Sequence, residues 1–486
     1  MQKTFLSNLI LIVVLNLLIK PFYILGIDAE VQNRVGAEIY GNYFALLNFS
    51  FLLNILLDFG ITNYNSRNIA QNPQLVNKHF GKLLTIRFTL FFIYVFFTIG
   101  SGLVIGYDSN EMYFVFLLVL NQFFVATIQY ARSNFAGLHL FKIDAFISVL
   151  DRTLLITLGG FLLWSPAMDS TFKIEWFIYA QTVTYLLTAL VSIIILKFKI
   201  GTIKLQLKKT FSLALLKESF PYALLILLMM FYNRIDSVML ERLLDDGDKQ
   251  AGIYAQGFRY LDAVNMFALL FAGLLLPIFA RLIKKSESIK PILSLGVKTL
   301  IPISLIIAIT AYFFQSDLIS LRYTDNIDEA SISFGFLILS FIPVSVTYIF
   351  GTLLTANGSL KKLNYMAVGG LVLNVVLNLF LIPKFKVEGA AIATLITQGV
   401  TAFIQLILVV LIFKLKTNWK LIGQIIGLTL AIVIINISLQ SAVGTNLSKV
   451  KLLLISLVLS TAIAFFIGVL PLRSLIPILK KKNSKY

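Results

Sequence analysis

The chain contains no cysteine and only two histidines among its 486 residues. Without cysteine it can form neither a disulfide nor a thiolate metal site. Two histidines, His79 and His139, are too few for a zinc-catalytic centre. We therefore predict a protein that uses no metal ion and no other cofactor.

Charged residues are also scarce, because Asp, Glu, Lys and Arg make up only 13% of the chain. Soluble proteins contain about 25%, and they need polar surface to cover a core. Here 58% of the residues are hydrophobic and the mean hydropathy is +0.89. These values predict an all-α integral membrane protein. The net charge of +18 could suit nucleic acid, but membrane proteins concentrate Lys and Arg in cytoplasmic loops, so we expect no nucleic-acid partner.

Apolar segments long enough to cross a bilayer recur along the whole chain. A spanning helix needs about 20 mostly apolar residues, and about fourteen such segments occur here. They cover residues 5–26, 40–61, 83–106, 111–131, 144–164, 176–196, 219–240, 253–280, 293–315, 332–355, 364–383, 389–413, 421–440 and 450–470. The first is too long for the core of a signal peptide and lacks a cleavage site, so we expect a retained helix.

The loops between these segments differ in positive charge. On the side that holds both chain ends they carry 27 Lys and Arg, whereas the opposite loops carry eight. Because positive charge marks the cytoplasmic side, we predict that both termini are cytoplasmic. Most acidic loop residues, including Asp245, Asp246 and Asp248, then lie outside.

Weak internal similarity predicts that the chain is duplicated. Ile39-Tyr40 matches Ile253-Tyr254 at an offset of 214 residues. At this offset Arg67 coincides with Arg281, Lys20 with Arg234, and Asn48 with Asp262. The duplication predicts two six-helix lobes that enter the membrane in the same direction, related by a parallel pseudo-twofold axis.

The longest basic link places the boundary between these lobes. We predict an N-lobe with helices 1 to 6 at residues 1–196 and a basic cytoplasmic linker at residues 197–218. A C-lobe with helices 7 to 12 follows at residues 219–413. Residues 414–486 form a terminal helix pair and a basic cytoplasmic tail.

Four charged residues lie within the two apolar segments that flank the acidic loop: Arg234, Asp236, Arg259 and Asp262. A charge at the bilayer centre costs about 2.5–3.5 kcal/mol, whereas each Leu, Ile or Phe returns about 0.3–0.6. A water-filled pathway is the usual reason for such charges. The alternative is a pair of salt bridges that fasten the hairpin, since Arg259 and Asp262 share a helix face. Lys20 has no acidic neighbour in the first segment and fits that alternative less well.

Further polar residues mark candidate binding and gating positions. Asn374 and Asn378 lie one turn apart on one helix face, where interhelical hydrogen bonds are the simpler explanation. Asp58 and Arg67 bracket the inner end of the second segment, as a helix cap or a gate salt bridge would. We predict a gate that consists of these two residues and Arg281, the counterpart of Arg67.

Several kinds of enzyme are disfavoured. The chain has no P-loop for nucleotide, and neither histidine lies at an outer face, so no Ser/His/Asp arrangement can be built. Asp246-Gly247-Asp248 is similar to the metal-sugar motif of some glycosyltransferases. That motif needs a soluble nucleotide-binding domain, and no loop here is long enough to hold one. We predict that the protein is not an enzyme.

Short motifs spread over the whole chain resemble those of polysaccharide flippases of the Wzx type. They are Val35-Gly-Ala-Glu-Ile-Tyr-Gly-Asn-Tyr43, Leu57-Asp-Phe-Gly60 followed by Arg67, Arg234-Ile-Asp-Ser-Val-Met-Leu240, Ala251-Gly-Ile-Tyr-Ala255, Gly370-Leu-Val-Leu-Asn-Val-Val-Leu-Asn-Leu379, Ile382-Pro383 and Glu388-Gly-Ala-Ala-Ile-Ala-Thr394. That family belongs to the multidrug/oligosaccharidyl-lipid/polysaccharide (MOP) exporter superfamily. The resemblance implies a MATE-like fold with twelve to fourteen helices, two lobes around a central cavity, and alternating access.

The resemblance also implies a substrate, partners and a location. The substrate would be an undecaprenyl-diphosphate-linked oligosaccharide, moved from the inner to the outer leaflet of the bacterial cytoplasmic membrane for O-antigen, capsule or exopolysaccharide biosynthesis. Besides the lipid bilayer, the partners would include a polysaccharide polymerase and assembly proteins. On this hypothesis the substrate-binding residues are Lys20, Arg234, Arg259, Asn48, Asn374 and Asn378, and the ion-coupling residues are Asp236 and Asp262.

Three alternatives stay open. A MATE-like multidrug or cation antiporter of the same fold often carries an acid in helix 1, whereas segment 5–26 contains Lys20 and no acid. A related flippase could carry peptidoglycan precursors or teichuronic acid. A polytopic glycan polymerase or glycosyltransferase would need a large outer loop, and the outer loops here are short.

Overall fold

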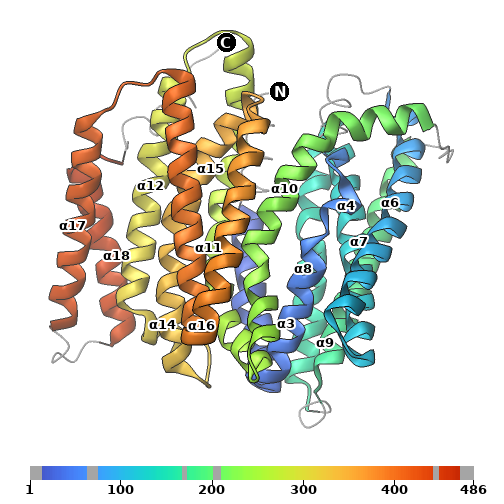
Figure 1. Ribbon diagram of the computed structural model, residues 1–486, viewed down its shortest axis with the longest axis horizontal. Coiled ribbons are helices and arrows are strands. Elements are labelled where there is room, and N and C mark those ends of the chain that lie inside the picture. Colours follow the sequence, from blue (N-terminus) through green and yellow to red (C-terminus); the bar gives the residue numbers. More distant parts are fainter. Residues whose placement is uncertain are drawn as a thin grey trace. The chain divides into compact units, whose positions relative to one another are not determined.

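The computed structural model describes residues 14–62, 75–138, 140–166, 172–200, 209–441 and 448–470. Within these ranges every regular element is a helix and none is a strand (Figure 1). Residues 14–22 are helical. The elements that follow are η1 (Tyr23–Asp28), α2 (Ala29–Val35), α3 (Ala37–Leu52), α4 (Ile55–Asp58), α6 (Leu75–Ile105), α7 (Ser109–Gly137), α8 (Phe141–Trp164), α9 (Ile174–Ile200), α10 (Lys209–Leu243), α11 (Gly247–Lys284), α12 (Lys290–Phe313), α13 (Gln315–Ser320), α14 (Ile327–Leu339), α15 (Phe341–Ala356), α16 (Leu360–Phe413), α17 (Trp419–Ser441) and α18 (Lys449–Phe466).

The predicted all-α membrane fold with about fourteen spans is confirmed. In the described chain, 12 helices are long and apolar enough to cross a membrane. One of them, α16, has 54 residues, or about 81 Å at 1.5 Å per residue, which far exceeds a hydrocarbon core of about 30 Å. Its backbone breaks at Lys386 (φ 47°, ψ −127°), so it forms two spans. The first helix, described from residue 14, adds another.

The first helix is longer than predicted. It continues past residue 26 through a π-helical stretch, η1, and ends at Val35. Gly36 alone joins it to α3, with φ 84° and ψ 165°. This backbone region is open to glycine and costly for other residues. The predicted outer loop is therefore a one-residue turn, and Asp28 lies within the helix.

The second span is interrupted between α3 and α4, at Leu53 and Asn54. Tighter backbone bonds bridge the break, since Asn54 N donates to the Phe51 carbonyl at 3.1 Å and Leu56 N donates to the Leu53 carbonyl at 2.9 Å. A side chain of α7 contacts the same place. Asn54 Nδ2 donates to Gln122 Oε1 at 2.7 Å, and Gln122 Nε2 donates to Ser50 Oγ at 3.3 Å.

The predicted basic linker is shorter than residues 197–218. Helix α9 extends to Ile200, and α10 already begins at Lys209. Ten residues before the predicted start at residue 219 are thus helical, and Pro221 lies inside α10. A proline is tolerated in a membrane helix because neighbouring groups satisfy the freed carbonyl.

The helices group into two compact units. Unit 1 comprises Met1–Ala255 and Val375–Lys386, and unit 2 comprises Gln256–Asn374 and Val387–Tyr486. In unit 1, α3 packs against α7 and α10, and α7 packs against α9. In unit 2, α12 packs against α14, α15 and the α17–α18 pair. The division into two six-helix lobes stays a prediction.

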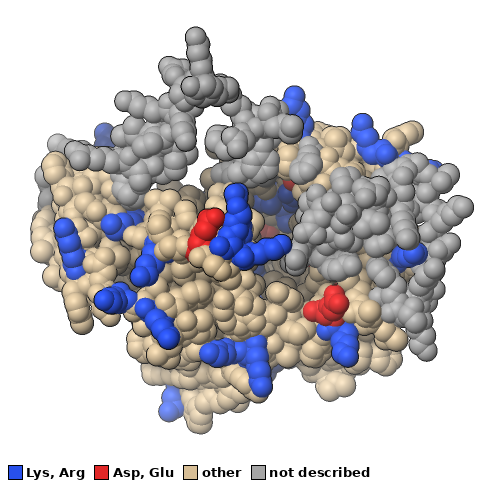
Figure 2. All heavy atoms as spheres, turned by 90° about the horizontal axis from the view of Figure 1, so that it is seen from above, with Lys and Arg blue, Asp and Glu red and all other residues tan. Residues whose placement is uncertain are grey.

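Lys and Arg clearly outnumber Asp and Glu among the described residues in the view of Figure 2, which is from above relative to Figure 1. Within unit 2, four exposed cations lie at and beside the connection between α11 and α12: Arg281, Lys284, Lys285 and Lys290. Such clustering is typical of a cytoplasmic face, and the orientation of the chain stays a prediction.

Candidate functional site

A lysine of the first helix lies among charged residues of α7 and α8. Lys20 is partly buried, and Arg132, Asp144, Asp151 and Arg152 act on it electrostatically. Arg132 Nε lies 2.7 Å from Asp144 Oδ1. Within the part of the chain that the structure describes, Lys20 forms no hydrogen bond and no ion pair. We call these five residues the Lys20 cluster; its three cations face two carboxylates, which leaves one positive charge uncompensated.

Arg152 is fixed within this cluster by an aromatic clamp. Its Nε lies 3.6 Å from Asp151 Oδ2, and its Nη1 donates to Tyr185 Oη at 2.5 Å. The guanidinium carbon lies 4.7 Å from the ring centre of Tyr23 and 5.3 Å from that of Tyr185. Asp151 and Arg152, adjacent in the sequence, thus form a local ion pair. No sequence pattern predicts that Lys20 lies near them.

The structure brings the predicted residues Arg234 and Asn48 together. Arg234 Nη1 donates to Asn48 Oδ1 at 3.3 Å, and its guanidinium carbon lies 5.4 Å from the ring centre of Phe51. Asn48 is buried and donates its own Nδ2 to the Phe44 carbonyl at 3.0 Å. Its side-chain oxygen therefore faces the arginine, so α10 and α3 are joined by a cation and a neutral amide.

Asp236 is buried in unit 1, with only 1% of its surface exposed, and both of its oxygens accept hydrogen bonds. Tyr254 Oη donates to Oδ2 at 3.0 Å, and Asn378 Nδ2 donates to Oδ1 at 2.6 Å. Asn378, which we predicted to bind substrate, thus donates a hydrogen bond to Asp236, which we predicted to couple ions. This fits the simpler expectation of an interhelical hydrogen bond for Asn378.

A second buried carboxylate, Asp28, was missed by the sequence analysis. It is 1% exposed and accepts from Tyr40 Oη at 2.6 Å. The statement that helix 1 contains no acid is therefore wrong, because the helix was ended too early. The available signal was the absence of glycine and proline between Ile27 and Gly36, which allows the helix to continue.

The two tyrosine–aspartate bonds span different lengths of chain. Asp28 and Tyr40 are 12 residues apart, whereas Asp236 and Tyr254 are 18 apart. The tyrosines match at the predicted offset of 214, and the aspartates match at 208. The predicted coincidence of Lys20 with Arg234 at the offset of 214 stays a prediction.

The remaining predicted binding and coupling residues belong to unit 2. Arg259 Nη1 lies 3.7 Å from Asp262 Oδ2, so the predicted shared helix face is confirmed. Arg259 and Asn374 are buried. Roles for these residues in binding or coupling stay predictions.

The predicted gate residue Asp58 pairs with an arginine of α6. Arg87 Nη1 lies 2.6 Å from Asp58 Oδ1, and the Thr62 hydroxyl also bonds this carboxylate. Arg67 lies outside the described residues. Arg281 is exposed in the last turn of α11. Arg87, which the sequence analysis did not single out, is a buried partner of Asp58.

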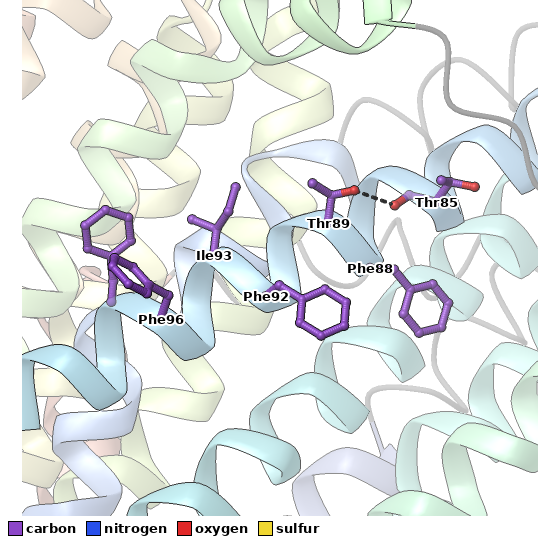
Figure 3. Close-up of a pocket in the computed structure, with 7 residues that line it drawn as sticks. Thr85, Phe88, Thr89, Phe92, Ile93 and Phe96 are labelled. Atoms are coloured by element: carbon purple, nitrogen blue, oxygen red, sulfur yellow. Dashed lines mark hydrogen bonds between the residues drawn. The ribbon is translucent and has the colours of Figure 1, made fainter.

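An apolar groove of about 430 Å³ lies along α6 (Figure 3). It is lined by one face of that helix: Thr85, Phe88, Thr89, Phe92, Ile93, Phe96 and Phe97. Its two hydroxyls are satisfied within the helix, since Thr89 Oγ1 donates to the Thr85 carbonyl and Thr85 Oγ1 donates to the Gly81 carbonyl. The groove offers no unsatisfied polar group, so it suits hydrocarbon and not the polar part of a substrate.

Solved structures with the same fold define the class of protein. Lipid II flippase MurJ in an inward closed conformation matches with a TM-score of 0.70 and 14% identity, over 96% of this chain and 100% of that one. An inward-facing MATE family transporter of the MOP superfamily matches with a TM-score of 0.62 and 13% identity, over 80% and 93%. The Vibrio cholerae MATE transporter VcmN, in a bent form, gives 0.56 and 13%, over 82% and 95%. The chain is a multi-pass membrane protein with the fold of MOP-superfamily transporters.

The family follows from the sequence itself. A family model described as "Polysaccharide biosynthesis protein" matches residues 5–283, more than half of the chain, and the chain belongs to this family. An uncharacterized membrane protein of Methanocaldococcus jannaschii is 28% identical over 189 residues, which are 39% of this chain and 44% of that protein. The chain thus matches less than half the length of this relative. The predicted placement among polysaccharide flippases of the MOP superfamily is confirmed.

Proposed function

We propose that this protein is a flippase for an undecaprenyl-diphosphate-linked oligosaccharide. It moves this lipid from the inner to the outer leaflet of the bacterial cytoplasmic membrane by alternating access, and so supplies cell-surface polysaccharide biosynthesis. Both termini are cytoplasmic in this proposal. A polysaccharide polymerase and assembly proteins act on the product after it is flipped.

The observation that carries the proposal is the uncompensated positive charge of the Lys20 cluster. An ionised side chain inside a membrane helix is costly and marks a pathway for polar or charged cargo. The diphosphate is the anionic part of the proposed substrate, and an ammonium without a fixed partner is a point charge that can bind it. Arg132 and Arg152 keep their carboxylate partners and shape the site around Lys20.

Arg234 extends the cationic surface onto α10. Its Nη1 donates to the Asn48 side chain, and its guanidinium lies near the ring of Phe51. Its planar fork suits bidentate phosphate binding. Arg259 takes the same role in unit 2, moderated by Asp262, because a substrate that is bound too tightly cannot leave.

Energy for the outward step comes from an ion gradient or from consumption of the product, since the sequence has no P-loop. Asp236 and Asp262 are the proposed coupling acids. The Asp236 carboxylate accepts hydrogen bonds from the Tyr254 hydroxyl and the Asn378 amide. Both groups are neutral and can donate or accept, so they can bond to the carboxyl group in its protonated or its ionised form.

One observation favours the second candidate, a MATE-like cation antiporter. Asp28 is a buried acid in helix 1, which is a position where such exporters often carry one. The two functions differ in what the cavity must bind. A cation exporter depends on Asp28 and tolerates the loss of Lys20, whereas a flippase of an anionic lipid depends on Lys20.

The test uses proteoliposomes with a fluorescent undecaprenyl-diphosphate-linked oligosaccharide. Lys20→Ala should abolish flipping, and Lys20→Arg should retain part of it, because the charge remains. Lys298→Ala is the matched control, since Lys298 is also a partly buried lysine within a membrane helix. Wild-type flipping by Lys20→Ala, together with loss of cation export in Asp28→Asn, would favour the antiporter.

A double variant separates substrate binding from mere fastening at Arg234. If Arg234 and Asp236 only pair with each other, neutralising both together should restore the activity that either single change removes. Under the flippase proposal, Arg234→Ala removes activity and the double change does not restore it. Arg234→Lys should be partly active, because Lys keeps the charge but loses the bidentate geometry.

A further inference from the structure

Nine exposed cations lie in three connections of unit 2 and at the helix ends beside them. They are Arg281, Lys284, Lys285 and Lys290 around the connection from α11 to α12, Lys361 and Lys362 at the start of α16, and Lys414, Lys416 and Lys420 between α16 and α17. Residues 281–290, 357–362 and 414–420 contain one carboxylate, Glu287, which lies 3.9 Å from Lys285 Nζ. Within the described chain the other eight cations form no ion pair, so this part of unit 2 carries a large uncompensated positive charge.

The three connections meet at one end of α12. The last turns of α12 and α17 are joined, because Gln440 Nε2 donates to the Phe313 carbonyl at 2.5 Å. These two helices pack against each other, so both begin at the opposite end, which is the end that carries the cations. Near that end, a methyl group built on Gly296 of α12 would lie 3.7 Å from Ile349 of α15, and α15 leads from there into the α15–α16 connection. The three groups of cations therefore form one surface, which we call the α12 basic surface.

An exposed tryptophan lies at the edge of the α12 basic surface. Trp419 is 76% exposed and begins α17, next to Lys420. Further along α17, Ile422 and Ile426 are exposed as well, as expected of a helix that faces lipid. Tryptophan favours the level of the lipid headgroups. The α12 basic surface therefore lies where phospholipid headgroups meet the protein.

We propose that the α12 basic surface binds the anionic headgroups of phospholipids in the predicted cytoplasmic leaflet. Charge complementarity is the argument, since clusters of Lys and Arg beside a membrane helix attract anionic lipids. The general excess of positive charge on the cytoplasmic side explains the sign of this charge, but it does not require the cations to be unpaired. At the opposite end of unit 2, Lys449 Nζ lies 2.7 Å from Asp317 Oδ1, so a lysine there has a partner within the protein.

The first experiment detects the lipid next to Trp419 by fluorescence. Trp164→Phe and Trp176→Phe together leave Trp419 as the only one of the three tryptophans. The protein is placed in vesicles of phosphatidylcholine and phosphatidylglycerol, in which one lipid or the other carries brominated chains that quench a neighbouring tryptophan. Phosphatidylglycerol should bind beside Trp419 about fivefold more tightly than phosphatidylcholine, which is the effect of one cation near an anionic lipid surface. Equal quenching by the two brominated lipids would overturn the proposal.

The second experiment removes charge from the α12 basic surface. Lys414→Gln, Lys416→Gln and Lys420→Gln together should bring the two lipids to equal binding, a loss of about fivefold. Lys451→Gln is the matched control, because Lys451 is an exposed lysine of α18 near the opposite end of unit 2. Size-exclusion chromatography checks that each variant is folded and monodisperse. A preference for phosphatidylglycerol that survives the triple change would contradict the role of these lysines, as would one that is unchanged in 1 M salt, where the screening length is about 3 Å.

Adding unbrominated lipid-linked oligosaccharide distinguishes the phospholipid from the proposed cargo. Loss of the quenching at a low share of this lipid would assign the surface to the cargo and overturn the proposal, whereas unchanged quenching would support it. None of these readouts needs transport. A protein that flips nothing but prefers phosphatidylglycerol beside Trp419 would refute the proposed function and leave the lipid-binding surface intact.

Discussion

Asp58 and Arg87 give the sharpest stability prediction, because water reaches the two partners unequally. The Arg87 side chain is 3% exposed and that of Asp58 is 24% exposed. Arg87 also donates to the Ala126 carbonyl at 2.7 Å and lies 5.0 Å from the ring centre of Tyr130. Asp58→Asn leaves a buried guanidinium without its carboxylate, whereas Arg87→Met leaves a carboxylate that water can reach.

The two single changes should therefore differ in cost. Breaking a fully buried ion pair costs about 3–5 kcal/mol. Because Asp58 is partly exposed, we expect about 2–3 kcal/mol for Asp58→Asn. Arg87→Met loses the Ala126 bond and the ring contact but keeps the volume, so about 1–2 kcal/mol is expected. The double variant should match Arg87→Met, because the buried charge is gone.

Thermal unfolding in detergent, followed by fluorescence of the three tryptophans, gives the order of stability. Asp58→Asn should unfold at the lowest temperature, and adding Arg87→Met to it should raise that temperature. Equal losses from the two single changes that simply add in the double variant would refute the reasoning. A variant of wild-type stability that fails to transport would instead support the predicted gate.

Three further predictions concern charge. Asp236→Asn and Asp262→Asn should each flatten the pH dependence of transport in proteoliposomes, and an unchanged profile in both would exclude them as coupling acids. The Lys386 ammonium, through a 2.8 Å hydrogen bond, holds the pKa of Asp246 below its ordinary value. A lowered folded-state pKa stabilises the fold above the unfolded pKa of about 3.9, and the effect is lost as pH falls through the folded value. Asp246→Asn should thus cost up to about 1 kcal/mol at pH 7 and nothing in strong acid, as seen from thermal unfolding at both pH values. A single cysteine at Asp246 should react with an impermeant maleimide on intact cells, and one at Lys285 should not; the reverse pattern would invert the predicted topology.

Hydropathy and charge were enough to predict the fold class. Segment length and apolarity depend on the bilayer more than on the tertiary structure. The count of spans therefore holds, with the break at Lys386 dividing α16 into two of the predicted spans. Helix ends were predicted less well. The first helix continues past residue 26, where the hydroxyl of Tyr40 donates a hydrogen bond to the buried carboxylate of Asp28. A hydropathy window does not detect a hydrogen-bond partner that lies twelve residues away.

The sequence predicted several residues of the candidate site but not the residues with which they interact. Lys20, Arg234 and Asp236 stood out because a charge in an apolar segment is unusual whatever surrounds it. Their partners depend on how helices pack. Arg152 lies close enough to act on Lys20 electrostatically although 132 residues separate them in the sequence. No pattern in the sequence links the two.

The single-glycine turn at Gly36 has a practical consequence for anyone who inserts a tag or an epitope into this protein. A connection of one residue, fixed at φ 84°, has no slack, so an insertion there must part the first helix from α3 before it can reach solvent. The loss of Gly36 in a library of random variants should be as damaging as the loss of a buried side chain. A detection tag inserted between the first two spans would therefore report on a damaged protein, although hydropathy alone predicts a loop there that tolerates insertion.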